Sequence, residues 1–223
     1  MDNSRQAYFK TSTIRLKSGE MMRRLASFRK RRALGLKRGR AALLVLDMQD
    51  YFLEPASHAF IPSAPAIVPG IRAMIAGFGR SGRPVCFTRH LNAAGDAGRM
   101  GIWWRELLTE DNPLSSITRR LDVGRGTILD KNQYDAFHET SLEAFLKERS
   151  VTQLVICGVM THLCCETTAR SAFVRGFEVF FAVDGTATYR EAYHRASLLN
   201  LSYGFALPVL VREVLKAVRS DGE

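Results

Sequence analysis

A carboxylate, an amine and a thiol each follow a short apolar segment of the sequence, at Asp47, Lys131 and Cys164. A carboxylate can accept the proton of a thiol, and a nearby ammonium group stabilises negative charge on both. If folding brings the three residues together, they make an activated cysteine nucleophile. Each residue alone has an ordinary structural explanation: Asp47 could cap a turn, Lys131 could be a surface charge and Cys164 a small buried apolar residue. Their joint occurrence favours chemistry.

The cysteine stands near the start of a predicted helix. Residues 158–165, GVMTHLCC, join an apolar segment at 154–157 to a helical pattern over 163–175. The amide protons and the dipole at a helix N-terminus favour the thiolate form of a cysteine, with pKa values of roughly 3.5 to 7.5. The same amides could stabilise an oxyanion on an attacked carbonyl group. We therefore expect a thiolate at Cys164.

Apolar segments of strand length alternate with amphipathic segments of helix length in most of the chain. The predicted strands cover residues 41–46, 84–88, 127–129, 154–157, 178–183 and 208–211. The predicted helices cover residues 64–78, 141–147, 163–175, 189–203 and 213–219. Strands that are apolar almost throughout indicate a mostly parallel sheet with helices on both faces, a doubly wound α/β fold. The carboxyl ends of such strands share one edge, where these folds bind ligands.

Two long connections, residues 53–69 and 91–112, follow strand ends and could form the walls of a pocket. Aromatic and histidine side chains on or near such connections are candidate substrate-binding residues: Phe52, His90, Trp103, Trp104, Tyr134, Phe137 and His162. An aromatic wall suits a planar or partly apolar substrate, and core or subunit packing is the alternative role of such residues. Arg89 or Arg170 could pair with a substrate carboxylate.

The net charge of +10 is distributed very unevenly. Residues 1–40 contain 13 Lys or Arg and two acidic residues, whereas residues 41–223 are close to neutral. This division predicts a basic N-terminal extension and a separate globular domain. Apolar residues at helical intervals in the extension indicate an amphipathic helix, either in a solvated arm or docked on the body. The alternatives are contact with an anionic surface and a cleaved targeting segment.

Composition excludes several classes of protein. The sequence has no apolar run of the roughly 18 residues that a membrane span needs and no secretory signal at its start. Four cysteines are few for a disulfide framework, so reduced thiols and a cytoplasmic location are expected. No motif for contacting nucleic-acid bases is present, and no specific nucleic-acid partner is predicted.

Three ordered motifs resemble the isochorismatase-like cysteine hydrolase family: DMQDYF at residues 47–52, Lys131 ahead of YDAF at 134–137, and GVMTHLC at 158–164. The resemblance covers about residues 40–215. It implies strand order 3-2-1-4-5-6, a small-molecule substrate and usually a homo-oligomer, here a dimer or tetramer.

The resemblance also assigns roles to the candidate residues. It implies that Asp47 is the general base, Lys131 the third member of a triad and Cys164 the nucleophile. It further implies a cis peptide bond between Val159 and Met160, with the amides of Met160 and Cys164 as the oxyanion hole.

These residues favour hydrolysis of a small amide or ureido substrate through a thioester. One alternative is isochorismatase itself, which cleaves a vinyl ether without a cysteine nucleophile; residues 40–44, 47–52 and 136–138 and His162 resemble it. A second alternative is a non-catalytic body with a basic arm that binds anionic surfaces. Removing residues 1–40 should leave hydrolysis intact if the protein is an enzyme.

The histidines do not predict a metal site. Nicotinamidases of this family bind a metal through an Asp-x-His motif, whereas here the first histidine after Asp47 is His58, and the five histidines are scattered. A metal needs convergent ligands. We therefore expect neither a metal nor another cofactor, and this argues against nicotinamide as the substrate.

Overall fold

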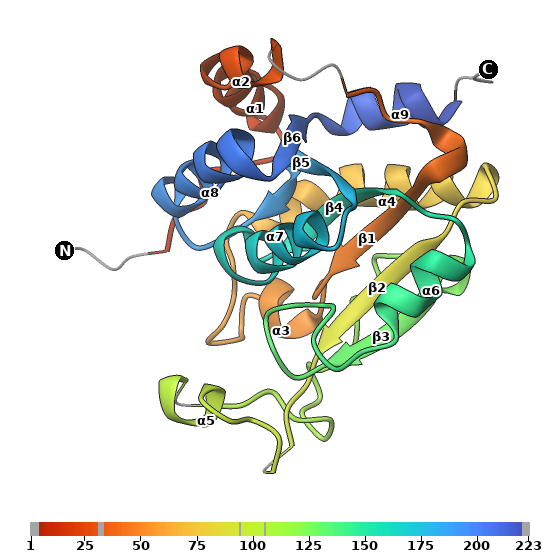
Figure 1. The fold of residues 1–223 in the computed structure, drawn as a ribbon. Helices are drawn as coiled ribbons and strands as arrows, with labels where there is room; N and C mark the ends of the chain where they lie inside the picture. The colour runs from red at the N-terminus through yellow and green to blue at the C-terminus, as the bar shows by residue number, and fades with distance from the viewer. Residues whose placement is uncertain (1–4, 31–33, 94, 105, 220–223) are drawn as a thin grey trace.

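The protein, described by a computed structural model, is built around a six-stranded sheet (Figure 1). The structure describes residues 5–30, 34–93, 95–104 and 106–219. The strands are β1 Ala41–Leu46, β2 Val85–His90, β3 Thr127–Lys131, β4 Gln153–Val159, β5 Glu178–Ala187 and β6 Ala206–Val209. All neighbouring strands are parallel, in the order β3-β2-β1-β4-β5-β6. The predicted doubly wound fold and its strand order are confirmed.

Helices connect the strands and cover both faces of the sheet. Among the described residues the α-helices are α1 Ile14–Arg24, α2 Ala26–Lys30, α3 Asp50–Leu53, α4 Ala64–Arg80, α5 Met100–Trp103, α6 Leu142–Glu148, α7 Glu166–Val174, α8 Glu191–Gly204 and α9 Val211–Arg219. A π-helix, Thr161–Cys165, precedes α7. In Figure 1, α4 lies behind the sheet and α7 in front of it beside α8, and α9 packs against α4. No helix in the described part of the chain is long and apolar enough to cross a membrane.

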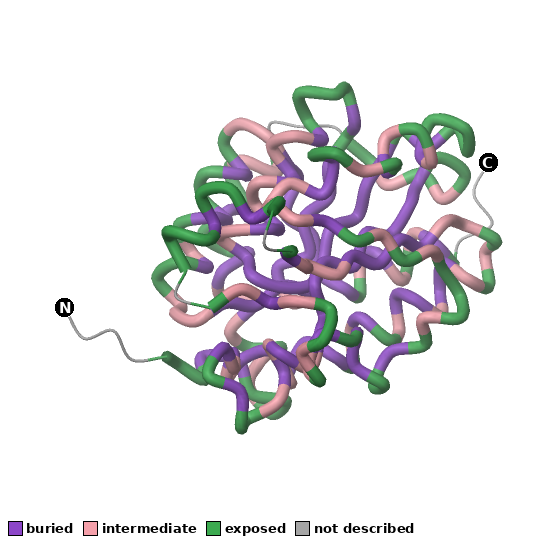
Figure 2. The backbone as a smooth tube through the Cα atoms, turned by 90° about the horizontal axis from the view of Figure 1, so that it is seen from below, coloured by how far each residue is buried: buried purple, intermediate pink, exposed green. Residues whose placement is uncertain are grey.

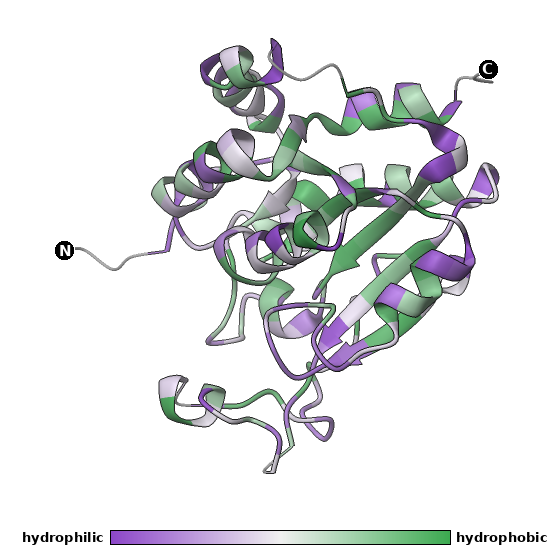
Figure 3. Ribbon diagram, viewed as in Figure 1, coloured by the Kyte–Doolittle hydropathy of each residue, from purple (hydrophilic) through white to green (hydrophobic). Residues whose placement is uncertain are grey.

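The inner strands are apolar because both of their faces are covered. Every residue of β1 and β4 is buried, and buried backbone runs through the middle of the molecule in Figure 2. β1 is hydrophobic along its whole length (Figure 3). The edge strand β3 differs, since Ile128 and Asp130 are exposed while the charged Lys131 at its end is buried. A buried ammonium group requires partners.

Some element boundaries differ from the predicted ones. The third strand continues to Lys131, and the sixth strand is β6 rather than residues 208–211. Leu210 and Val211 are also buried, so the apolar segment continues from β6 into α9. Hydrophobicity alone cannot show where a strand ends when the following helix is buried as well. Cys164 lies in the π-helix and not in the first turn of an α-helix.

The basic N-terminal segment packs on the rest of the protein. Its apolar side chains join the main hydrophobic core: Tyr8, Phe9, Met21, Met22 and Leu25. Two of its basic residues form ion pairs with the body, Lys17 with Glu191 at 2.7 Å and Arg29 with Glu213 at 3.0 Å. Of the two structural interpretations, the docked helix agrees with this packing and the solvated arm does not. Removing residues 1–40 would therefore uncover part of the core, and this argues against the expectation that activity survives the truncation.

Candidate active site

Three strands bring the acid, the amine and the thiol to one edge of the sheet. Asp47 directly follows β1, Lys131 is the last residue of β3, and Cys164 lies in the π-helix after β4. The chain continues from β1 to β2 on one side, and β4 lies on the other side of β1. This edge is therefore the topological switch point, where doubly wound sheets bind ligands.

Lys131 lies at the centre of this cluster. Its Nζ is 2.9 Å from Oδ2 of Asp47 and donates a hydrogen bond to Sγ of Cys164 at 3.5 Å. It also donates to the carbonyl oxygen of Gln133 at 2.9 Å and lies 3.4 Å from Nδ1 of His90. The side chains of Lys131 and Asp47 are at most 1% exposed. Their charges therefore interact far from solvent, where electrostatic interactions are strong.

The Asp47 carboxylate is fixed by a neighbouring strand. Thr88 on β2 donates its hydroxyl to Oδ1 of Asp47 at 2.6 Å, and the Asp47 N–H donates to Thr88 Oγ1 at 3.1 Å. Within the described residues, Oδ2 accepts no well-aligned hydrogen bond, although the Lys131 ammonium is close to it. Oδ2 is therefore the oxygen that can accept the proton of the Cys164 thiol.

Burial and charge determine the protonation of the resting site. Burial raises the pKa of the Cys164 thiol, Asp47 raises it further, and Lys131 opposes both. Burial lowers the pKa of Lys131, but Asp47 and Cys164 more than compensate, so this pKa is raised overall. Burial and then the Lys131 charge lower the pKa of His90 to about 4. The resting site holds an ammonium–carboxylate pair, a neutral imidazole and a neutral thiol. Burial and the Asp47 charge favour the neutral thiol in this state, against the thiolate expected from a position at a helix start.

The segment between β4 and the cysteine has an unusual backbone. The peptide bond between Val159 and Met160 is cis, at the position that the family resemblance implied. Gly158 has a φ of 115°, and a Cβ on this residue would collide with the carbonyl oxygen of Leu46. Glycine is therefore required where β4 passes β1 just before the site.

A buried hydrogen-bond network around His194 contacts the start of the π-helix that carries Cys164. Nδ1 of His194 lies 3.0 Å from Oγ1 of Thr161 and 3.1 Å from the hydroxyl of Tyr8. The Tyr8 hydroxyl also accepts a hydrogen bond from the N–H of Thr188 at 3.0 Å. Tyr8 belongs to the N-terminal segment, so this segment takes part in holding the loop that carries Cys164.

A cavity of about 310 Å³ opens onto the thiol. Five of the seven predicted pocket residues line it: Phe52, His90, Trp103, Trp104 and Tyr134. The oxyanion-hole candidates Met160 and Cys164 line it as well. The indole N–H of Trp104 donates to the Tyr134 hydroxyl at 2.8 Å. The cavity wall is therefore mainly aromatic, with a few polar groups.

Two predicted pocket residues lie elsewhere. Phe137 is buried and its ring stacks on Phe177, with ring centroids 5.8 Å apart, so the core-packing alternative holds for it. His162 contacts Thr188 Oγ1 through Nδ1 at 2.7 Å and packs on the Tyr193 ring. In the π-helix, Leu163 and Cys164 line the cavity, whereas His162 faces α8.

The cavity also has lining residues that the sequence did not single out: Arg5, Tyr51, His58, Asn92, Glu106 and Tyr189. Tyr51 lies within the DMQDYF motif and could have been recognised from its position. Nothing in the sequence indicated Arg5. The two arginines that were considered for a substrate carboxylate have other partners, since Arg89 pairs with Asp130 and Arg170 with Glu166, each at 2.7 Å.

One group of metal-binding atom types occurs at the site. Asp47, His90 and Cys164 each offer one potential ligand atom, and these three atoms lie within 4.8 Å of one another. The Lys131 ammonium, however, contacts all three residues at 2.9 to 3.5 Å. A metal ion held by the three would be placed against this positive charge. The donor set does not fit a metal ion while Lys131 is protonated.

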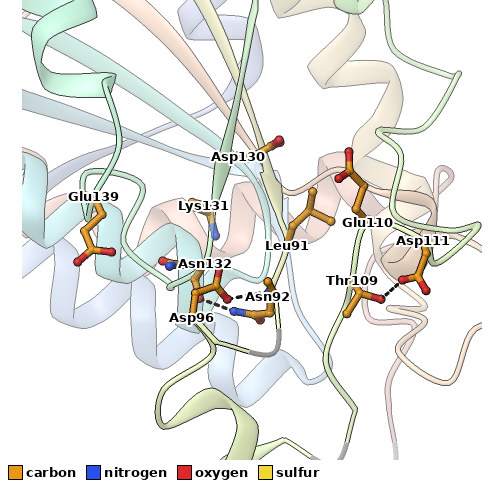
Figure 4. Close-up of a pocket in the computed structure, with 11 residues that line it drawn as sticks. Leu91, Asn92, Asp96, Thr109, Glu110, Asp111, Asp130, Lys131, Asn132 and Glu139 are labelled. Carbon is orange, nitrogen blue, oxygen red and sulfur yellow. Dashed lines mark hydrogen bonds between the residues drawn. The ribbon is translucent and has the colours of Figure 1, made fainter.

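A second and larger hollow of about 520 Å³ lies next to the site. Asn92 lines both this hollow and the aromatic cavity, and Lys131 of the charged cluster also lines the hollow. Figure 4 shows carboxylates along its walls. Asp130 is paired with Arg89, and Asp96 accepts a hydrogen bond from the N–H of Ala93. Its lining includes no cysteine, so the aromatic cavity at Cys164 is the candidate active site.

Fold and site together define the class of the protein: a doubly wound α/β protein with a buried cysteine, aspartate and lysine at its switch point. The chain belongs to the Isochorismatase domain family, whose profile matches residues 41–213. The match covers all six strands and excludes the N-terminal segment.

Known proteins with similar sequences agree with this assignment. Nicotinamidase 3 of Arabidopsis thaliana is 39% identical over 171 residues, which are 74% of this chain and 82% of that protein. Enterobactin synthase component B of Escherichia coli K12 is 33% identical over 181 residues, 80% of this chain and 63% of that protein. The crystal structure of a cysteine hydrolase from Pseudomonas syringae pv. phaseolicola 1448A superimposes with a TM-score of 0.79 at 27% identity, covering 83% of this chain and 95% of that chain.

Proposed function

We propose that the protein hydrolyses a C–N bond of a small amide or ureido compound through a thioester on Cys164. The observation that carries the proposal is the position of the Lys131 ammonium, which touches both the Asp47 carboxylate and the Cys164 sulfur beside an aromatic cavity. The name of the Arabidopsis relative, a nicotinamidase, agrees with amide chemistry. It also places nicotinamide among the substrates to be tested, against the expectation from the histidine pattern.

In the first half of the reaction the thiol becomes the nucleophile. Oδ2 of Asp47 accepts the proton of Cys164, and Lys131 stabilises the resulting thiolate. The sulfur attacks the carbonyl carbon, and the carbonyl electrons move to its oxygen. The amides of Met160 and Cys164 are the proposed donors to this oxyanion. When the C–N bond breaks, the proton held by Asp47 passes to the departing amine.

In the second half, water removes the acyl group. Asp47, again ionised, accepts a proton from a water molecule that attacks the thioester carbonyl. The C–S bond breaks, the sulfur recovers the proton and the acid is released. The net reaction consumes one water and yields an acid and an amine. His90 has a pKa lowered to about 4 and stays neutral near neutral pH, so it can orient the substrate but does not supply charge.

Vinyl ether cleavage is the second candidate, and the segments that resemble isochorismatases favour it. It requires no thiol, whereas the thiol here is positioned by Lys131 beside the cavity. The non-catalytic alternative does not explain why a buried Lys131–Asp47 ion pair lies beside a cysteine at the cavity.

The test is turnover of nicotinamide, N-carbamoylglycine and isochorismate by the wild type and by Cys164→Ala. We expect amide or ureide cleavage by the wild type alone, with a thioester adduct detected by mass spectrometry of the quenched protein. Cleavage of isochorismate alone, retained in Cys164→Ala, would establish the vinyl ether alternative. A homo-oligomer, either dimer or tetramer, and a cytoplasmic location remain predictions; light scattering of the purified protein measures the first.

A further inference from the structure

The N-terminal segment supplies a charged residue to the active-site cavity. Arg5 lies outside the part of the chain that matches the family profile, yet it lines the cavity that also exposes Cys164. Its guanidinium stacks on the ring of Tyr189, 4.3 Å from the ring centre, and donates one hydrogen bond to the carbonyl oxygen of Phe60 at 3.0 Å. These two contacts hold the group at the cavity wall.

The residue that follows Arg5 is fastened tightly to the body. Gln6 donates its N–H to the carbonyl oxygen of Tyr189 at 2.8 Å, and its own carbonyl accepts from the Ser63 hydroxyl at 3.1 Å. Its side-chain oxygen accepts from the N–H of Glu191 at 3.1 Å. Three further residues along, Phe9 is buried in the core. The position of Arg5 is therefore set by the fold and not by chance contact of a loose end.

The charge of Arg5 is not neutralised by the residues that the structure describes. No carboxylate lies within ion-pairing distance of it in the described part of the chain, whereas Glu106, the acidic residue of the same cavity, lies 3.4 Å from His58. Next to the cavity, behind Cys164, Lys131 and Asp47 form an ion pair with each other. Among the described residues that line the cavity, Arg5 is the one arginine or lysine, and the wall beside it is mainly aromatic.

We propose that Arg5 is a substrate-binding residue that recognises a carboxylate at the far end of the amide or ureido substrate. A guanidinium matches the geometry of a carboxylate and can donate to both of its oxygens. The preferred substrates are then amide or ureido acids, with the scissile carbonyl at Cys164 and the carboxylate at Arg5. This inference rests on the proposed amide hydrolysis.

Binding to the Cys164→Ala protein tests the inference without any need for turnover. The ligands are N-carbamoylglycine and N-carbamoyl-β-alanine, which differ in length, and for each the alkylurea in which an alkyl end replaces the carboxylate. By calorimetry we expect at least one acid to bind about tenfold more tightly than its alkylurea, the range of a charge-assisted hydrogen bond. Adding Arg5→Ala should remove this preference and leave alkylurea binding unchanged, and Arg5→Lys should keep part of it.

Arg15→Ala is the matched control, because it removes one exposed positive charge from the same segment without touching the cavity. It should leave all affinities unchanged. The preference should also weaken as salt is added, because charges at the protein surface are screened. Equal binding of acids and alkylureas, failure of the acids to bind, or loss of acid binding in Arg15→Ala as in Arg5→Ala would overturn the proposal. Failure of the proposed hydrolysis would appear instead as the absence of turnover and of a thioester in the wild type.

Discussion

Replacing Lys131 with methionine, which is similar in volume but uncharged, should damage both stability and activity. The ammonium has contacts at 2.9 Å with Asp47 and Gln133 and at 3.5 Å with Cys164, and Asp47 is at most 1% exposed. Removing one partner of a buried ion pair typically destabilises a protein by about 3 to 5 kcal/mol. We expect a loss of this size at pH 8, measured by urea unfolding, and a loss of amide turnover, because the thiolate has lost its stabilising cation.

The loss of stability should depend on pH in a defined direction. In Lys131→Met the buried Asp47 carboxylate has no counterion, so the folded state binds a proton more readily than the unfolded state does. Stability then falls as pH rises, by up to about 1.4 kcal/mol per pH unit. The wild type has a Lys131 pKa raised above its ordinary value. Its ion pair therefore contributes stability at neutral pH that is lost as pH rises through that raised pKa.

Two comparisons make the reasoning refutable. The double variant Asp47→Asn, Lys131→Met contains no buried charge at these positions and should recover much of the lost stability. Lys17→Met removes an ion pair with Glu191 whose side chains are 34% and 25% exposed, and it should cost less than about 1 kcal/mol. If Lys131→Met is equally stable at pH 5 and pH 8, or the double variant is no more stable than the single one, the buried charge pair does not control this site.

Three further predictions follow from other features of the structure. Because burial and Asp47 raise the pKa of Cys164, alkylation of the resting enzyme by iodoacetamide should be slow at pH 7 and should accelerate as pH rises, with Cys164→Ala as the blank; a rate that is constant from pH 5 upward would contradict it. Tyr8→Phe removes a hydroxyl that contacts His194 and Thr188, and should lower the free energy of unfolding by about 1 to 3 kcal/mol and also lower kcat; unchanged urea denaturation would show that the network is not stabilising. Gly158→Ala should prevent folding or cost more than about 3 kcal/mol, because the added Cβ meets the backbone of Leu46, whereas Gly204→Ala, where a Cβ has open space, should change the melting temperature little; a Gly158→Ala protein as stable as the wild type would contradict the collision.

The sequence was sufficient to predict the sheet and the meeting of three distant residues. Apolar segments of strand length showed where β1, β3 and β4 run, and a parallel sheet places their carboxyl ends together. The sequence alone therefore predicts that Asp47, Lys131 and Cys164 meet at one site. The strand order depended on the resemblance to a known family, because periodicity alone does not give the order of strands.

The protonation of the cysteine could not be predicted in the same way. The sequence showed Cys164 near a helix start, which favours a thiolate. It could not show how deeply the sulfur is buried or that the Asp47 carboxylate lies beside it, and these two factors raise the pKa. The sequence located the cysteine correctly, but its pKa depends on Asp47, which lies more than a hundred positions away in the chain.

The pocket was predicted in part for a similar reason. Trp103, Trp104 and Tyr134 follow strand ends, and their places on the wall agree with the rule for parallel sheets. Phe137 is three residues after Tyr134 in the same connection but points into the core, and the sequence does not distinguish these two directions. Arg5 was missed because a segment rich in positive charge gives no sign of which arginine will reach the cavity.

The aromatic wall has a practical consequence. Trp103 and Trp104 are the two tryptophans of the chain, and both border the same hollow. Intrinsic emission excited at the indole band therefore originates entirely from the rim of the candidate active-site cavity. Binding of unlabelled compounds in the cavity can therefore be detected by quenching or a wavelength shift of the tryptophan fluorescence, without an activity assay.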